Sequence, residues 1–287
     1  MAGPMLHSVD LPDLLALSED AARRGGELAL AHFNPGSKTS AGISYKDGGS
    51  PVTEADLAVD SFLKQHLGDI RPDFGWLSEE TADSPERMTH QRIWIVDPID
   101  GTKSFARGDQ DWTIAIALVE QGLPVLGCIY APTTQEMFTA IAGHGAFLNG
   151  VRLSGGTSRT LDGARLVGPK PLVDALSGHH QGFVRTERVH SLALRLARIA
   201  QGWADAGVAE AHAHDWDLAA AHAILNEAGL VLHTREKAVP TYNRPTTQHD
   251  AIAGGPLHLV TPLTDMLQRI NLDRIAVEDG TPSPSSH

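Results

Sequence analysis

Residues 93–108, IWIVDPIDGTKSFARG, decide the fold of this chain. Their apolar and mostly β-branched beginning, IWIV, predicts a strand that is buried on both faces. We expect this strand to end at Asp97-Pro98, because proline removes the next backbone donor of the sheet. Asp97, Asp100 and the compact turn Gly101-Thr102 would then lie together at the carboxyl end of a strand, where α/β sheets usually bind ligands.

The chemistry of this strand end suits a phosphate that is bound through metal ions. Carboxylates alone would repel a phosphate group. Divalent cations between them would reverse this repulsion, because carboxylate oxygens bind hard metals and the metals bind phosphate oxygens. The backbone N–H groups of Gly101 and Thr102 could donate to the same phosphate.

Length and composition indicate an ordinary globular protein. With 287 residues, the chain could form one large domain or two intimately packed ones. Hydrophobic residues make up 41% of it, and 28 glycines and 17 prolines divide it into many short elements, as in a mixed α/β protein. The net charge of -12 argues against nonspecific binding of nucleic acid, whose phosphates need a basic surface.

The single cysteine and the first residues exclude further classes. Cys128 excludes an internal disulfide and a thiolate zinc cluster, and its apolar surroundings predict a buried core thiol. The chain begins MAGPMLHSVD, without a basic segment followed by an apolar one, and no stretch reaches about 18 consecutive apolar residues. We therefore expect a soluble, cytoplasmic protein that does not bind a membrane.

The first half of the chain predicts two helices and a series of strands. Apolar residues at helical spacing predict a helix over residues 11–33, and Thr53 with Asp56 forms a capping box at the start of a second helix. A short strand over 74–78 delivers Glu79-Glu80 at its end, so a strand followed by an acid occurs twice. Antiparallel strands are expected at 113–119, 125–130, 136–141 and 146–148.

A Gly/Ser/Thr-rich stretch at 153–160 is the best candidate for a boundary between two lobes. We predict an N-terminal α/β lobe over 1–155, a C-terminal α/β lobe over 156–278 and a disordered tail over 279–287. Asp217 lies at the start of a helix, where the helix dipole favours a carboxylate. In this lobe we expect strands at 164–167, 204–209, 230–233 and 251–253, and helices at 172–176, 191–199, 218–228 and 263–270.

Four segments together resemble the inositol monophosphatase superfamily of metal-dependent, lithium-sensitive phosphatases. Each alone also fits an ordinary loop, turn or helix cap, but LSEET, WIVDPIDGTKSF and HDWDLAAAHAILNEAG occur in the order and at the approximate separations of its signatures. Lys46 with SPVTEAD, residues 50–56, is the fourth segment. The resemblance implies a layered αβαβα sandwich of the inositol monophosphatase and sugar phosphatase type, and a small phosphorylated metabolite as substrate.

The resemblance also implies a role for each residue of the site. The metal ligands would be Glu79, Asp97, the backbone carbonyl of Ile99, Asp100 and Asp217, which would hold two or three Mg²⁺ ions. The substrate would be bound by Lys46, Ile99, Asp100, Gly101, Thr102 and Asp217, and a solvated loop charge is the alternative for Lys46. Asp56, Glu79 and Thr102 would be catalytic, with Asp56 and Thr102 orienting the attacking water.

Histidines and arginines of the second lobe suggest other roles. The histidines at 212, 214, 222 and 233 raise the hypothesis of a zinc hydrolase, but no HExxH pair exists, so we interpret them mainly as surface residues or neighbours of the site. Arg185, Arg188, Arg195 and Arg198 could steer an anionic substrate. Arg195 and Arg198, on one helical face, are more often solvated.

Details within the signatures favour one substrate class. LSEE, SPVTEAD and DGTKSF differ from the inositol monophosphatase pattern and resemble 3'(2'),5'-bisphosphate nucleotidases, which act on 3'-phosphoadenosine 5'-phosphate. Residues 242–244 could contact a nucleobase or form a turn after a strand. Inositol-1-monophosphatase, histidinol-phosphate phosphatase and an inactive binding module remain alternatives, although the last would be expected to lack one of the acids. A homodimer also remains open.

Overall fold

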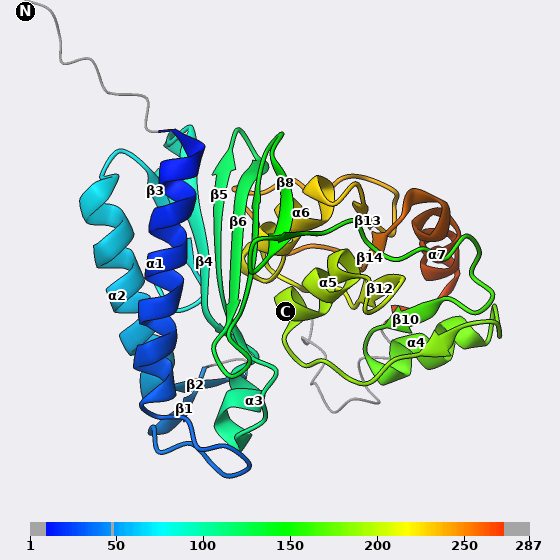
Figure 1. Cartoon of the computed structure of the whole chain (residues 1–287), viewed down its shortest axis with the longest axis horizontal. Helices are drawn as coiled ribbons and strands as arrows, with labels where there is room; N and C mark the ends of the chain where they lie inside the picture. Colours follow the sequence, from blue (N-terminus) through cyan, green and yellow to red (C-terminus); the bar gives the residue numbers. More distant parts are fainter. Residues whose placement is uncertain (1–9, 47–48, 273–287) are drawn as a thin grey trace, which may run out of the picture.

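The computed structural model describes residues 10–46 and 49–272, in which helices and sheets alternate in five layers (Figure 1). Helices α1 (Leu11–Leu30) and α2 (Glu54–Ile70) cover the outer face of the first sheet. Helices α5 (Leu192–Gln201) and α6 (Asp215–Glu227) lie between the two sheets, and α4 (Lys170–Ser177) and α7 (Leu257–Arg269) cover the second sheet. The predicted αβαβα sandwich is confirmed.

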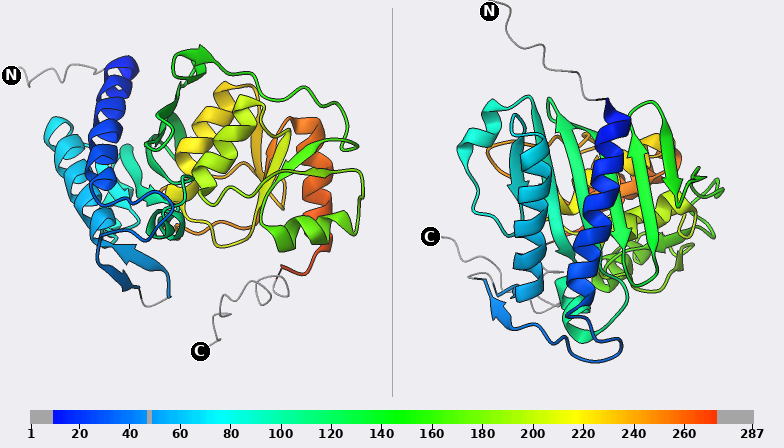
Figure 2. Two further views of the ribbon diagram at one scale, coloured as in Figure 1. Left: turned by 60° about the horizontal axis from the view of Figure 1, so that its bottom comes forward. Right: turned by 60° about the vertical axis from the view of Figure 1, so that its left-hand side comes forward.

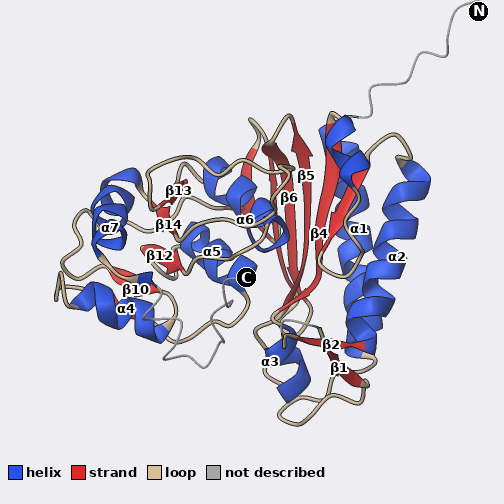
Figure 3. Ribbon diagram, turned by 180° about the vertical axis from the view of Figure 1, so that it is seen from behind, coloured by secondary structure: helices blue, strands red, loops and turns tan. Residues whose placement is uncertain are grey.

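The first sheet contains seven strands in the order of the chain (Figure 3). β3 is parallel to β4, and all other neighbours are antiparallel, as predicted for residues 113–148. The strands are β3 (Gly75–Ser78), β4 (Arg92–Asp100), β5 (Thr113–Glu120), β6 (Leu123–Ala131), β7 (Glu136–Ile141), β8 (Gly145–Leu148) and β9 (Val151–Arg152).

Strand β4 is buried on both faces. Trp94 and Val96 pack in the core beneath α1 and α2, whereas Ile93 and Ile95 pack in the core that contains α5 and α6. The predicted end at Asp97-Pro98 is wrong, because β4 continues to Asp100 with a shift of register against β5 between Asp97 and Asp100. Pro98 lies at this irregularity, where the regular ladder of hydrogen bonds is already interrupted.

The second sheet has five strands in the order β11-β10-β12-β14-β13. They are β10 (Arg165–Val167), β11 (Val184–Arg185), β12 (Ala206–Ala209), β13 (Val231–Thr234) and β14 (Ile252–Gly255). β11 was not predicted, since two residues carry no periodicity. Helix α7 begins six residues before its predicted start at 263, because Leu259 and Val260 are buried and hold a first turn that precedes the internal Pro262.

A hairpin of β1 (Ile43–Tyr45) and β2 (Pro51–Thr53) leads into α2 and projects beyond the end of the first sheet (Figure 2). The capping box of Thr53 and Asp56 begins α2, as predicted. Cys128 is buried, also as predicted, and burial raises the pKa of its thiol far above the usual range.

Two further predictions concern the ends of the chain and its lobes. The tail 279–287 lies outside the described residues, and the division into lobes near residue 155 stays a prediction. Within residues 10–46 and 49–272, no helix combines the length and the apolar character needed to cross a membrane.

Candidate metal centre

Three aspartates from distant parts of the chain meet in one cavity. Asp97 and Asp100 come from the end of β4, and Asp217 is the third residue of α6. One carboxylate oxygen of each lies within 4.8 Å of an oxygen of the others. Glu79, which follows β3, lines the same cavity of about 350 Å³. The structure thus brings together all four acidic side chains that were predicted as metal ligands.

These carboxylates are held in an environment that disfavours negative charge. Burial, together with the charges of Glu79, Asp100 and Asp217, raises the pKa of Asp97 well above its usual range. Burial, with Asp100 and Glu79, does the same to the pKa of Asp217. Burial raises the pKa of Asp100 to about 6, although the hydroxyl of Ser191 and the N–H groups of Leu192 and Ala193 donate to its carboxylate.

One buried oxygen in this cluster is unpartnered. Asp97 is 1% exposed, and among the described residues its Oδ1 atom has no hydrogen-bond partner. A buried carboxylate oxygen normally accepts a hydrogen bond or binds a cation, because leaving it bare is costly. The donor set of Asp97, Asp100, Asp217 and Glu79 consists only of carboxylate oxygens, the ligands that Mg²⁺ and other hard divalent cations prefer. The residues therefore fit a divalent metal.

Lys46 contacts two glutamates beside this cluster. Its Nζ atom lies 2.8 Å from Oε1 of Glu79 and 2.8 Å from Oε1 of Glu80. Burial alone would lower the pKa of Lys46, but the two carboxylates outweigh burial and raise it. Burial raises the pKa of Glu80 to about 7 despite the hydrogen bond from Lys46. Lys46 is therefore a charged neighbour of a predicted metal ligand, and not a solvated loop lysine.

Asp56 and Thr102 form a hydrogen-bonded pair. Oγ1 of Thr102 lies 3.0 Å from Oδ1 of Asp56 and 3.0 Å from the carbonyl oxygen of Ile99. The other oxygen of Asp56 accepts from the backbone and hydroxyl of Thr53. Burial raises the pKa of Asp56 to about 6, although these hydrogen bonds oppose the shift.

The turn after β4 explains how Thr102 comes to face Asp56. Gly101 is the N-cap of the short helix α3 (Thr102–Arg107) and has a φ of 97°, a conformation that favours glycine. Thr102 is the first residue inside the helix. Thr102 is therefore not the N-cap of α3, and its hydroxyl is free to bond Asp56.

Lys103, Arg188 and Arg195 line the same cavity, and the last two were candidates for steering an anionic substrate. Arg195, predicted as solvated, is only 8% exposed, and its guanidinium donates to the carbonyl of Val189. Arg188 also lines the cavity and makes no hydrogen bond or ion pair with a described residue. Arg198 is not solvated either, because it forms an ion pair with Glu136. A helical pattern could not show that Arg195 sits at the first turn of α5, against Asp100.

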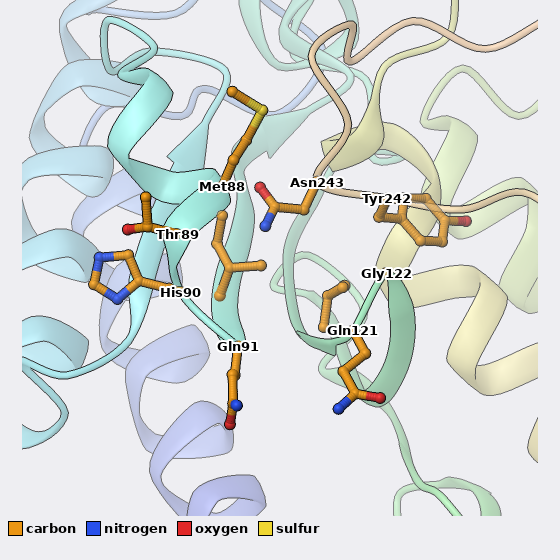
Figure 4. Close-up of a pocket in the computed structure, with 10 residues that line it drawn as sticks. Met88, Thr89, His90, Gln91, Gln121, Gly122, Tyr242 and Asn243 are labelled. Atoms are coloured by element: carbon orange, nitrogen blue, oxygen red, sulfur yellow. The ribbon is translucent and has the colours of Figure 1, made fainter.

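Residues 242–244 do not line the cavity of the acids. Tyr242 is buried, and its hydroxyl bonds Nδ1 of His222. Tyr242 and Asn243 line another cavity with Gln91, Ile93 and Gln121 (Figure 4). That cavity lies near the beginning of β4, whereas the acids lie at its end, so the contact of residues 242–244 with a nucleobase stays a prediction.

The histidines do not form a zinc site. His222 is buried, contrary to the expectation of a surface position, and burial lowers its pKa to about 4. Within the part of the chain that the structure describes, the two groups of potential ligands are Asp97 with Asp100 and Asp217, and Asp109 with Asp111 and His190. Neither contains the two or more histidines of a zinc hydrolase.

The αβαβα sandwich, with buried acids at the end of a central strand, fits a metal-dependent enzyme. Residues 10–265 match the profile of the inositol monophosphatase family, and the chain belongs to this family. Its members are metal-dependent phosphatases that act on small phosphorylated substrates.

Relatives that are named for different substrates have similar sequence identity to this chain. The chain is 33% identical over 240 residues to an inositol monophosphatase of Mesembryanthemum crystallinum, covering 79% of this chain and 87% of that one. It is 36% identical over 228 residues to a histidinol-phosphatase of Mycobacterium tuberculosis, with coverage of 76% and 85%. It is 32% identical over 223 residues to the 3'(2'),5'-bisphosphate nucleotidase CysQ of Salmonella typhimurium, with coverage of 74% and 87%.

A solved structure supports the fold. An IMPase of Thermotoga maritima superposes with a TM-score of 0.78 at 25% identity, covering 93% of this chain and all of the other.

Proposed function

We propose that this chain is a Mg²⁺-dependent, Li⁺-sensitive 3'(2'),5'-bisphosphate nucleotidase that removes the 3'-phosphate of 3'-phosphoadenosine 5'-phosphate. The observation that carries this proposal is the pair Arg188 and Arg195 in the cavity of the acids. Arg188 has no acidic partner among the described residues, and the guanidinium of Arg195 is held in place by the carbonyl of Val189. A substrate with a second anionic group beyond the scissile phosphate would use both charges.

Glu79, Asp97, Asp100, Asp217 and the carbonyl of Ile99 would hold the metal ions. When bound, these ions would polarise the phosphoryl oxygens, lower the pKa of a water molecule and stabilise the departing alkoxide. The unpartnered Oδ1 of Asp97 supports this assignment, since a cation would satisfy it. The backbone N–H groups of Gly101 and Thr102, together with Lys46, would bind the scissile phosphate.

Asp56 and Thr102 would orient the attacking water. Thr102 can donate its only hydroxyl proton to Asp56, which leaves its oxygen lone pairs to accept a hydrogen bond from water. That hydrogen bond would direct a lone pair of the water toward phosphorus, and the proton would pass from the water through Thr102 to Asp56. The pKa of Asp56, raised to about 6 by burial, suits a group that accepts a proton near neutral pH.

Histidinol phosphate is the second candidate, because the relative from Mycobacterium tuberculosis is 36% identical to this chain. Histidinol phosphate carries a positively charged amine, which Arg188 and Arg195 would repel. Inositol 1-phosphate has no second anionic group and would leave both arginines without an anionic group of the substrate to bind. The cations of the cavity therefore favour the bisphosphate over either alternative.

The test is a substrate panel measured with Mg²⁺, with Mg²⁺ and Li⁺, and with EDTA. We expect the highest kcat/KM for 3'-phosphoadenosine 5'-phosphate, ahead of histidinol phosphate, inositol 1-phosphate and fructose 1,6-bisphosphate. Arg195→Met should raise the KM for the bisphosphate but leave that for adenosine 3'-monophosphate nearly unchanged. Arg198→Met, on the same helix but outside the cavity, is the matched control. A preference for histidinol phosphate would overturn the proposed substrate, and full activity in EDTA would overturn metal dependence.

A further inference from the structure

Asp215 lies two residues before the proposed metal ligand Asp217 and is itself fully buried. Both of its oxygens are used inside the protein. Oδ1 lies 2.7 Å from Nε2 of His249, and Oδ2 accepts from the backbone N–H of Asn243 at 2.8 Å. Asp215 is not among the acids that line the cavity of Asp97, Asp100 and Asp217. It is an anchor between the start of α6 and the chain segment 242–249.

This segment holds the first turn of α6 at several further points. The backbone N–H of Asp215 donates to the carbonyl of Thr247, and Nδ1 of His214 lies 2.8 Å from Oγ1 of Thr247. The N–H of His249 donates to the carbonyl of Ala213. All of these contacts lie within four residues of Asp217 in the sequence, on the chain that precedes it.

The anchoring reaches the carboxylate of Asp217 through His214. The backbone N–H of His214 donates to Oδ2 of Asp217 at 2.6 Å and so fixes this carboxylate, one oxygen of which lies within 4.8 Å of oxygens of Asp97 and Asp100. A shift of the backbone at His214 would therefore move the oxygen that faces Asp97 and Asp100. The position of that oxygen depends on Asp215 and on its partners.

The anchor extends to the first sheet. Nη1 of Arg87 donates to Oδ1 of Asn243, and Nη2 donates to the carbonyl of Arg244. Arg87 is buried and belongs to the 3-10 helix η1 (Pro85–Thr89), which lies between β3 and β4 in the chain. Figure 4 shows the next residue, Met88, across a cavity from Asn243. Arg87, Asn243 and Asp215 thus connect the part of the chain that carries Glu79 and Asp97 with the part that carries Asp217.

We propose that Asp215 and His249, with Arg87 and Asn243 behind them, are positioning residues that set the place of Asp217 in the metal centre. This proposal rests on the proposed function, because it takes Asp217 to be a metal ligand. The residues touch neither metal nor substrate and act through the backbone of His214. A metal centre assembled from the first sheet and helix α6 needs such a connection, because its geometry depends on how α6 is held relative to β4.

The test compares the Mg²⁺ dissociation constant, measured by titration calorimetry without substrate, and the Mg²⁺ concentration for half-maximal activity in His249→Leu, His249→Gln and the parent protein. His249→Leu removes the donor to Asp215, and we expect both values to rise about 10-fold, with kcat at saturating Mg²⁺ changed less than about threefold. His249→Gln keeps an N–H donor and should restore most of the loss. Asp205→Asn, which disturbs a buried acid paired with Arg165 in the second sheet, is the control for stability alone.

The outcomes separate this proposal from the metal assignment. If Asp217→Asn raises the half-activating Mg²⁺ concentration but His249→Leu does not, the positioning role is overturned and the metal role stands. If Asp217→Asn itself leaves Mg²⁺ activation unchanged, the metal assignment fails. If His249→Leu folds poorly, the second variant is Arg87→Met, which is more distant from Asp217. Measured well below its Tm, Arg87→Met should show the same rise in the half-activating Mg²⁺ concentration. An unchanged concentration in Arg87→Met would also overturn the proposal.

Discussion

The ammonium group of Lys46 lies 2.8 Å from the carboxylate of Glu79. A divalent cation bound to Glu79 would have to share this carboxylate with the lysine. The side chains of Lys46 and Glu79 are 30% and 22% exposed, so solvent screens the pair only in part.

Replacing Lys46 by methionine should therefore change metal and substrate binding in opposite directions. We expect Mg²⁺ to bind about three- to tenfold more tightly without substrate, because a nearby positive charge is removed. The KM for the substrate should rise, because the phosphate loses a cationic partner. Calorimetry with Mg²⁺ and steady-state kinetics measure the two effects. Lys64→Met, at an exposed position of α2, should change neither, and weaker Mg²⁺ binding by Lys46→Met would contradict the prediction.

Replacing Asp100 by asparagine should separate folding from catalysis. The one acceptor oxygen of asparagine can serve Ser191 and the N–H of Ala193, and only the longer hydrogen bond from Leu192 is lost, so the fold should persist. The rate should fall at least ~10²-fold, because a charged ligand is lost from ions that act in the transition state. The stabilisation of the protein by Mg²⁺ in thermal unfolding should shrink in parallel. Near-normal turnover with parental Mg²⁺ stabilisation would reject the metal site.

The affinity for Mg²⁺ should increase with pH. Burial raises the pKa of Asp100 to about 6, and the pKa of Asp97 and of Asp217 is raised as well. In the metal-free protein these groups hold protons at pH values where ordinary carboxylates have lost them, so a metal must displace protons as it binds. Affinity should therefore fall as pH is lowered from about 7.5 to 5.5.

Titration calorimetry in two buffers with different ionisation enthalpies measures this proton release. At pH 6 the parent protein should release protons on binding Mg²⁺, and Asp100→Asn should release fewer. An affinity that does not depend on pH, without proton release, would show that the carboxylates are already ionised in the metal-free protein.

Elements could be predicted from the sequence where the local pattern and the tertiary structure agree. The run IWIV is apolar at every position, and β4 is indeed buried on both faces. Thr53 and Asp56 satisfy each other within one turn, so the capping box survives in the fold. The approach of Asp217 to Asp97 and Asp100 came from the resemblance, since no periodicity relates residues more than a hundred positions apart.

The features that the sequence could not show depend on long-range packing. Arg195 has the spacing of a solvated helical residue, yet it is buried because α5 begins against Asp100. Tyr242 follows no apolar pattern. It is nevertheless buried, and its hydroxyl bonds His222 on another element. Pro98 indicated the end of a strand, but β4 continues beyond it because the register shift accommodates the missing donor.

The role of Thr102 can be separated from its contribution to stability. Thr102→Ala removes the hydroxyl that bonds Oδ1 of Asp56, and the buried carboxylate loses one donor. We expect a loss of about 1–2 kcal/mol in the free energy of unfolding and a fall in kcat of about 10²-fold, because a water-orienting group is removed. Mg²⁺ activation should stay close to that of the parent, since Thr102 is not among the proposed ligands.

Thr102→Ser and Thr102→Val provide the matched comparison. Serine keeps the hydroxyl and should recover most of the turnover, whereas valine keeps the shape of threonine and should be as slow as alanine. Because Gly101, and not Thr102, is the N-cap of α3, none of these variants removes a helix cap. A structural role alone predicts that turnover follows the Tm across the series. Valine with normal kcat and a lowered Tm would remove Thr102 from the catalytic residues and leave Asp56 without its partner.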